Sequence, residues 1–335
     1  MKIKNINTEI KYISLKTPFI TALRRVQEIE FVRVFVICDN GTVGIGEAPA
    51  TKAITQEDIQ SILTSISKIK EQLIGLELVY ALKHLHLSHI GSSAKASLDM
   101  AFMDLFGYFQ ILNPKPIKTD ITISLNETQK MLSDAKSAFD LGMDILKIKL
   151  GSDIKHSICV TKELSQSLPD AKLLIDANQS WSLDDSLKYL NAINDLQIEL
   201  IEQPVVAEDL KSLKIITNNS NVAILADEAV FTLKDVKKVI ESKSADMINI
   251  KLMKCGGVSR AVEILEYARE HKISCMLGSM LEGPYSINAA LYLAFNYRDV
   301  IKYVDLDSPL LYKNESSELD FKFDGCIILH KEIAQ

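Results

Sequence analysis

Short apolar runs recur roughly every 25 residues between positions 121 and 305 of the chain. Runs such as the Leu-Leu-Ile at 173–175 are continuously apolar, which is typical of parallel strands that are covered on both faces. Amphipathic segments separate the runs, and Ser182 precedes Asp185 at the spacing of a capping box, a signal for the start of a helix. The pattern therefore predicts eight strands alternating with helices, the order of a closed parallel barrel.

The first 115 residues follow a different pattern, which is typical of an α+β domain. Residues 30–38 and 44–47 are expected to pair as antiparallel strands on either side of a turn. Residues 56–72 and 92–110 have the periodicity of amphipathic helices. We therefore predict a separate N-terminal domain that mixes strands and helices.

The end of the chain is expected to return to this N-terminal domain. No helix signal follows the eighth barrel strand, which predicts a TIM-like (β/α)7β barrel. Residues 319–324 alternate apolar and polar side chains with a period of two, which predicts a further strand that is added to the N-terminal domain. The predicted domains are a barrel over 116–309 and an α+β domain over 1–115, completed by 310–335.

Composition and charge narrow the class of protein. The 335 residues are 47% hydrophobic and 24% charged, which suits a barrel with a second domain, and no apolar run is long enough to predict a membrane helix. The formal net charge of −6 gives no reason to expect nucleic acid or an anionic membrane as a partner. The five cysteines are scattered and the N-terminus lacks the apolar core of a signal peptide. We expect a cytoplasmic protein, for which a homo-oligomer is compatible with the sequence.

Charged and hydroxyl side chains stand at the ends of the predicted strands. Barrel folds keep their chemistry at the carboxyl ends of the strands, so these side chains are candidate site residues. Packing alone does not account for carboxylates on three consecutive strands with lysines on both sides. The candidates are Thr122, Lys147, Lys149, Asp176, Glu202, Asp227, Lys251, Ser279, Asp305 and Asp307.

Three of the candidates predict a metal site. Asp176, Glu202 and Asp227 are hard oxygen ligands from three neighbouring strands, and no histidine or cysteine accompanies them. This ligand set favours Mg²⁺, or Mn²⁺, over zinc. An octahedral Mg²⁺ with three protein ligands would keep positions for water and for a substrate carboxylate.

The lysines predict proton transfer on two faces of a bound substrate. Lys147 and Lys149 are two residues apart on one strand, so both point into the barrel. Lys251 belongs to a strand on the far side of the carboxylate strands. A carbon atom held between these lysines can lose a proton to one base and regain it from the other. The expected reaction is inversion at a carbon α to a carboxylate.

Five motifs at these strand ends resemble the enolase superfamily, in its muconate-lactonizing subgroup, and the resemblance covers essentially the whole chain. The resemblance implies that Lys149 and Lys251 are the acid/base pair and that Lys147 helps to stabilise the enolate. It also implies Mg²⁺ binding by the three carboxylates and an N-terminal capping domain that closes over the barrel mouth. The motifs are K-I-K at 147–149, D-A-N at 176–178, E-Q-P at 202–204, A-D-E at 226–228 and I-N-I-K at 248–251.

Two further features are similar to the dipeptide epimerases of this subgroup. Asp305 and Asp307 resemble the D-x-D that binds the α-ammonium group of the dipeptide, and residues 17–24 resemble a capping loop whose arginine, here Arg24, meets an acidic side chain. Gly283 departs from the hydroxyl residue that relatives often carry. The resemblance implies a 1,1-proton transfer at the α-carbon of the C-terminal residue of a dipeptide, with L-Ala-L-Glu and its epimer L-Ala-D-Glu as the expected substrates, as in the recycling of cell-wall (murein) peptides. The other expected substrate contacts are Thr122, Ser279 and Met280.

Other functions stay open at this point. An o-succinylbenzoate synthase or N-succinylamino acid racemase would keep the lysines and carboxylates, but its substrate has no ammonium group for Asp305 and Asp307. A dipeptide epimerase for a non-acidic second residue would leave Arg24 with another role. A Schiff-base aldolase using Lys251 would not need three metal carboxylates, and a binding protein would not need an acid/base pair.

Overall fold

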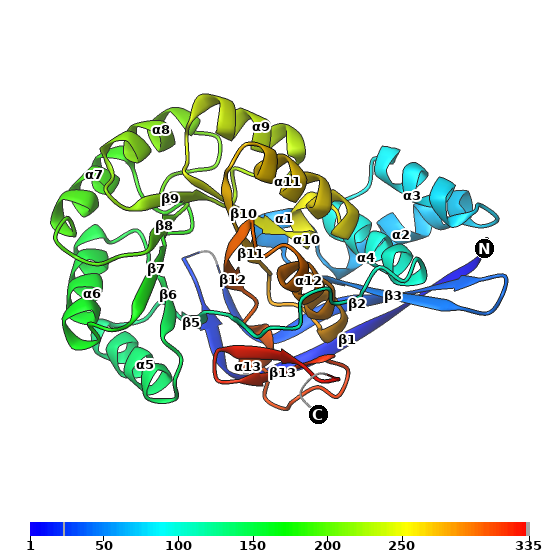
Figure 1. Ribbon diagram of the computed structural model, residues 1–335, viewed down its shortest axis with the longest axis horizontal. Helices are drawn as coiled ribbons and strands as arrows, with labels where there is room; N and C mark the ends of the chain where they lie inside the picture. The colour runs from blue at the N-terminus through cyan, green and yellow to red at the C-terminus, as the bar shows by residue number, and fades with distance from the viewer. Residues whose placement is uncertain (23, 333–335) are drawn as a thin grey trace.

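The computed structural model describes residues 1–22 and 24–332, and Figure 1 shows a ring of strands and helices beside a smaller N-terminal domain. The eight-stranded sheet runs in sequence order from β5 to β12, and each neighbouring pair of strands is parallel. The predicted parallel barrel is therefore confirmed. Its strands are β5 (Ile121–Ile123), β6 (Ile145–Lys149), β7 (Lys172–Asp176), β8 (Leu200–Glu202), β9 (Ala223–Ala226), β10 (Met247–Lys251), β11 (Ser274–Gly278) and β12 (Ile301–Asp305).

A long helix follows each barrel strand except the last, as the sequence predicts. Ser182 caps α7 by accepting a hydrogen bond from the backbone N–H of Asp185 at 3.1 Å. A short helix, α10 (Leu252–Cys255), lies between β10 and α11. Within the described part of the chain, no helix is long and apolar enough to span a membrane. The helices are α5 (Thr128–Asp140), α6 (Ile154–Ser167), α7 (Leu183–Ala192), α8 (Leu210–Asn219), α9 (Leu233–Ser242), α11 (Val258–Glu270) and α12 (Pro284–Asn296).

The barrel closes between its first and last strands through bonds outside the regular ladder. The backbone N–H of Asp120 donates to the carbonyl oxygen of Val304 at 3.0 Å. The hydroxyl of Thr119 donates to the same carbonyl at 3.2 Å and accepts from the N–H of Leu306 at 3.0 Å. These contacts hold the residues just before β5 against the end of β12.

The barrel interior consists of an apolar layer below a polar layer. Inward-facing and outward-facing side chains alternate along each strand, so positions two residues apart fill successive layers. Asp176 and Glu202 follow Leu174 and Leu200 in this way. The apolar layer therefore forms the floor on which the polar side chains stand. It consists of Leu174, Leu200, Leu225, Met247, Met276 and Tyr303.

The N-terminal domain packs helices α2 and α4 on an antiparallel sheet of order β1-β2-β3. The predicted strands and helices correspond to β2, β3, α2 and α4, whereas the long strand β1 and helix α3 were not predicted. Gly46 of β3 lets α4 approach closely, because a Cβ atom there would lie 1.9 Å from the carbonyl oxygen of Ser97. The elements are β1 (Ile3–Ile20), β2 (Arg25–Cys38), β3 (Val43–Pro49), α1 (Lys52–Thr55), α2 (Ile59–Leu73), α3 (Leu78–Leu87) and α4 (Ser92–Leu105).

The C-terminal segment leaves the barrel after the four-residue helix α13 (Ser308–Leu311) and contacts the N-terminal domain, where the N–H of Lys313 donates to the Ser14 carbonyl at 2.8 Å. The predicted strand at 319–324 is present as β13 (Phe321–Asp324). Its expected pairing was wrong. It pairs with β14 (Ile327–His330), which pairs with β4 (Ile117–Lys118), because the chain reverses at Gly325 with φ +57° and forms a hairpin.

The contact between β3 and α4 makes Gly46 sensitive to substitution. In Gly46→Ala, the free energy of unfolding should fall by about 1–3 kcal/mol, because the new methyl group would overlap backbone atoms of α4. Gly151→Ala is the matched control, since its Cβ would meet only the flexible side chain of Leu125, at 3.1 Å. Urea unfolding followed by circular dichroism measures both. Equal stabilities would contradict the packing described here.

Candidate active site

The predicted site residues gather at one pocket between the barrel mouth and the N-terminal domain. About 560 Å³ of space free of protein atoms lies in this pocket, part of it open to solvent. Lys147, Asp176 and Glu202 are fully buried in the barrel interior. The other nine predicted residues line the pocket: Arg24, Thr122, Lys149, Asp227, Lys251, Ser279, Met280, Asp305 and Asp307.

Lysines pair with all three predicted metal ligands. In the sheet, Asp176 of β7 lies between Lys149 of β6 and Glu202 of β8. The Nζ atom of Lys149 is 2.5 Å from Oδ2 of Asp176. In the same layer, the Nζ atoms of Lys147 and Lys251 are 2.7 Å from Glu202 and 2.8 Å from Asp227, respectively. The structure thus brings the expected carboxylates and lysines together as one buried charge network.

The pKa of Glu202 shows how the buried carboxylates act on one another. Burial raises its pKa to about 7, and the carboxylates of Asp176 and Asp227 add to the effect. By contrast, the ammonium groups of Lys149 and Lys147 outweigh the burial of Asp176 and lower its pKa. Glu202 is therefore the carboxyl group of this layer whose negative charge is least compensated.

These residues fit a hard divalent cation. The Oε2 atom of Glu202 is in charge contact with Lys147, yet no described donor is directed at it with hydrogen-bond geometry. Such an atom, between two further carboxylates, is a suitable metal ligand, because a cation would relieve the repulsion among the three groups. Asp176, Glu202 and Asp227 could hold Mg²⁺ or Mn²⁺.

Lys254 is a buried member of this network that the sequence analysis did not identify. It is 2% exposed, and its Nζ atom lies 2.5 Å from Oδ1 of Asp227 and 3.0 Å from the carbonyl oxygen of Asn249. Asn249 in turn donates to Oε1 of Glu202 at 2.7 Å. Lys254 therefore holds the Asp227 carboxylate at Oδ1, whereas Lys251 contacts Oδ2. Its sequence signal was weak because it lies in α10, beyond the strand end.

Glu228 and Asn178 were also missed, although both belong to the motifs at 226–228 and 176–178. They line the pocket, and the side-chain amide of Asn178 donates to Oε1 of Glu228 at 3.4 Å. Burial raises the pKa of Glu228 to about 8, with the neighbouring charge of Asp227 as the next cause. Their positions next to the predicted metal ligands were the signal that could have identified them.

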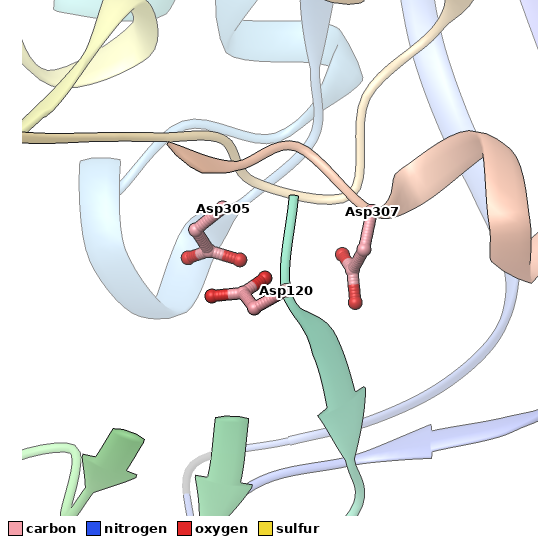
Figure 2. Close-up of side chains that lie close together, drawn as sticks. All are labelled: Asp120, Asp305 and Asp307. Carbon is pink, nitrogen blue, oxygen red and sulfur yellow. The ribbon is translucent and has the colours of Figure 1, made fainter. Parts of the chain in front are cut away.

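Asp305 and Asp307 form an acidic wall of the pocket. Asp305 ends β12 and lies 2.5 Å from Nζ of Lys147, whereas Asp307 precedes α13 and accepts a hydrogen bond from the N–H of Thr122 at 2.8 Å. Figure 2 shows Asp120 between them, and oxygen atoms of the three residues lie within 4.8 Å of one another. Asp120 was not among the predicted site residues, because it precedes its strand.

The N-terminal domain contributes Arg24 to the pocket, as predicted. Burial lowers the pKa of Arg24 to about 10, which leaves the guanidinium protonated at neutral pH. No described carboxylate forms a salt bridge with it. The pocket therefore offers a desolvated positive group from the capping loop and negative groups from the barrel.

Comparison with known proteins identifies the family that this fold and site define. Residues 5–112 match the model of the mandelate racemase / muconate lactonizing enzyme N-terminal domain, and residues 130–329 match the enolase C-terminal domain-like model. The chain belongs to this family, which confirms the resemblance seen in the sequence.

Three proteins that are similar to this chain are named as epimerases. A Sulfurimonas denitrificans protein named L-amino acid-D/L-Glu epimerase is 60% identical, with 98% of this chain and 99% of the relative covered. The structure of a substrate-liganded L-Ala-D/L-Glu epimerase from Bacillus subtilis has a TM-score of 0.93 at 36% identity, covering 98% and 96%. A dipeptide epimerase from Enterococcus faecalis V583, complexed with Mg and L-Leu-L-Tyr, has a TM-score of 0.91 at 33% identity, covering 98% and 97%.

Proposed function

We propose that this protein is a Mg²⁺-dependent dipeptide epimerase that inverts the α-carbon of the C-terminal residue of a dipeptide. The observation that carries the proposal is the placement of two lysines on either side of the carboxylate layer. Lys149 contacts Asp176 from β6, and Lys251 contacts Asp227 from β10. A substrate carbon between them is within reach of a base on each face, as inversion requires. The names of the relatives support the same reaction.

In the proposed mechanism, each lysine serves one face of the substrate. One takes the α-proton and the other delivers a proton to the opposite face, so both epimers interconvert. Lys147 adds a fixed positive charge beneath the reacting carbon, because its contacts with Glu202 and Asp305 hold it in place. Bound Mg²⁺ would supply positive charge for the substrate carboxylate, held by Asp176, Glu202 and Asp227.

The two ends of the pocket support a dipeptide with a free amino terminus and an acidic second residue. Asp305 and Asp307 are suited to an α-ammonium group, which needs a counter-charge in a water-poor site. Arg24 can pair with a glutamyl carboxylate through its planar guanidinium. We therefore propose L-Ala-L-Glu and related L-amino acid-Glu dipeptides as substrates, as in cell-wall peptide metabolism.

The alternatives fit the pocket less well. The substrate of an N-succinylamino acid racemase or o-succinylbenzoate synthase has no ammonium group, so Asp305 and Asp307 would face it without a partner. A Schiff-base aldolase using Lys251 would not need the three buried carboxylates Asp176, Glu202 and Asp227 beside it. A non-acidic second residue would leave the half-buried Arg24 without an anionic partner.

Three further expectations stay proposals. The domain boundaries are placed at 115/116 and 309/310. A cytoplasmic location is supported by the five cysteines, all of which are free. A homo-oligomer is compatible with the fold.

The metal proposal predicts loss of activity on chelation. Stripping with EDTA should abolish epimerisation, and Mg²⁺ or Mn²⁺ should restore it. Glu202→Gln should weaken Mn²⁺ binding about tenfold or more, because it removes one of three anionic ligands. Electron paramagnetic resonance of Mn²⁺ reports that binding without turnover. Glu199→Gln is the control, because it makes the same substitution at a glutamate that accepts a hydrogen bond from the Tyr303 hydroxyl and is not a proposed metal ligand. Full activity of the stripped enzyme would refute the metal assignment.

The two-base proposal predicts a different result for each lysine. Lys149→Ala and Lys251→Ala should each lower epimerisation by at least about a hundredfold, since inversion needs both faces. Each variant should still exchange the α-proton of one epimer with D₂O, and the two variants should favour opposite epimers. Proton NMR measures both rates, with Lys172→Ala at the exposed start of β7 as control. Near-native epimerisation by either variant would exclude the two-base mechanism.

The role of Arg24 predicts a change in specificity. Arg24→Ala should lower kcat/KM for L-Ala-L-Glu about ten- to a hundredfold, the effect of losing one charged contact, and change L-Ala-L-Leu turnover little. Arg25→Ala is the matched control, because Arg25 is adjacent but exposed. If Arg24→Ala lowered kcat/KM equally for both dipeptides, Arg24 would not recognise the acidic side chain.

A further inference from the structure

Asp120 is a fully buried acid that the proposed mechanism does not yet use. Its backbone N–H closes the barrel on Val304 at 3.0 Å, which fixes its position beside the end of β12. It lies two residues before Thr122, which lines the pocket, so its side chain also points into the barrel, one layer deeper. Figure 2 shows its carboxyl group directed toward that of Asp305.

No described donor satisfies the Asp120 carboxyl group. Neither of its oxygens accepts a hydrogen bond from a described N–H or O–H group, and oxygens of Asp305 and Asp307 lie within 4.8 Å. Two acid groups that share a hydrogen bond need one proton between them. Burial raises the pKa of Asp120 well above its usual value, and the charge of Asp305 is the next cause. Asp120 is thus the member of the three that carries the proton.

We propose that Asp120 is a positioning residue for the substrate ammonium group: as a neutral acid it donates its O–H to Asp305 and holds that carboxylate toward the pocket. This inference rests on the proposed function, since Asp305 must bind an ammonium group for its orientation to matter. Lys147 holds the same carboxylate at Oδ2, 2.5 Å away. Two donors from two directions leave Asp305 little freedom to rotate.

The charge of the wall supports a neutral Asp120. Asp305 and Asp307 carry two negative charges when ionised, and the ammonium group of Lys147 beside them is shared with Glu202. An excess of negative charge therefore remains at Asp305 and Asp307, which a substrate ammonium group would neutralise. An ionised Asp120 would add a further charge without a donor, which buried carboxylates avoid. In this cluster Lys147 and the Thr122 N–H already occupy Oδ2 of Asp305 and Oδ2 of Asp307, which disfavours a metal ion there.

Two substitutions of Asp120 separate its hydrogen bond from its volume. Asp120→Leu removes the donor and keeps a similar shape beside the apolar layer, so the protein should fold. Asp120→Asn keeps a neutral donor. Asp104→Ala in α4 is the control, because it removes a half-buried carboxyl group remote from the pocket that accepts a bond from the Ile45 N–H. Thermal melting of all three, with bound Mg²⁺, establishes folding.

The experiment compares kcat/KM for L-Ala-L-Glu with kcat/KM for N-acetyl-L-Ala-L-Glu and reports their ratio. Both constants are measured by α-proton exchange in D₂O, which detects slow turnover. In Asp120→Leu the ratio should fall about tenfold or more, mostly through KM of the free-amine substrate. Asp120→Asn should recover most of that loss. Asp104→Ala should leave the ratio unchanged.

Each other outcome contradicts a specific step of the proposed role of Asp120. If Asp120→Asn is as impaired as Asp120→Leu, the site needs an anion and not a donor. If Asp120→Leu lowers kcat/KM equally for both substrates, or leaves the ratio of the two constants unchanged for another reason, Asp120 does not position Asp305. If the unaltered enzyme does not distinguish the two substrates, the ammonium role of Asp305 and Asp307 in the proposed function fails, and this inference fails with it. Should Asp120→Leu not fold, Asp120→Ala replaces it with the same criteria.

Discussion

The buried ammonium group of Lys147 is the contact on which the arrangement of the site depends. Its Nζ atom lies 2.5 Å from Asp305, 2.7 Å from Glu202 and 3.4 Å from Asp176, so one side chain of β6 joins β7, β8 and β12. Removing one partner of such a buried network leaves the others uncompensated and costs about 3–5 kcal/mol. The positions of the proposed metal ligands and of the proposed ammonium-binding carboxylate are therefore set by the same charge, so neither can move independently of the other.

The contact between domains leaves no room for a side chain at Gly283. Helix α12 begins after Gly283, and its first amides, from Tyr285 and Ser286, donate to Oε2 of Glu47 in β3 at 3.0 and 3.2 Å. A Cβ atom at Gly283 would lie 2.5 Å from that oxygen. The N-terminal domain thus replaces a local side-chain cap with its own carboxylate. The loop that carries Met280 into the pocket is consequently tied to the N-terminal domain, which couples the shape of the pocket to the docking of that domain.

The sequence predicted the features that follow from local periodicity and failed where distant segments meet. The barrel and its polar strand ends were predictable because side chains alternate along strands, which brings Asp176 and Glu202 into one layer. The pairing of β13 was not predictable, since alternation indicates a strand without naming its partner. Lys254 and Asp120 were missed because one lies in a short helix after its strand and the other before its strand. Their roles depend on contacts with Asp227 and Asp305 that only the closed barrel creates.

The proposed catalytic residues and the proposed specificity residue Arg24 stand on different parts of the protein. The lysines and carboxylates stand on strands of a closed barrel, where the ladder and the apolar floor fix them. Arg24 stands on the connection between β1 and β2, and Ile20 at the end of β1 bonds Leu125 at 3.0 Å and Ser124 at 3.1 Å. The half-buried guanidinium of Arg24 lacks a described carboxylate partner, so an anionic ligand group would balance its charge. On the proposed role of Arg24, a change in the preferred second residue would require altering this loop and not the barrel, so that one set of proton-transfer residues could serve several dipeptides.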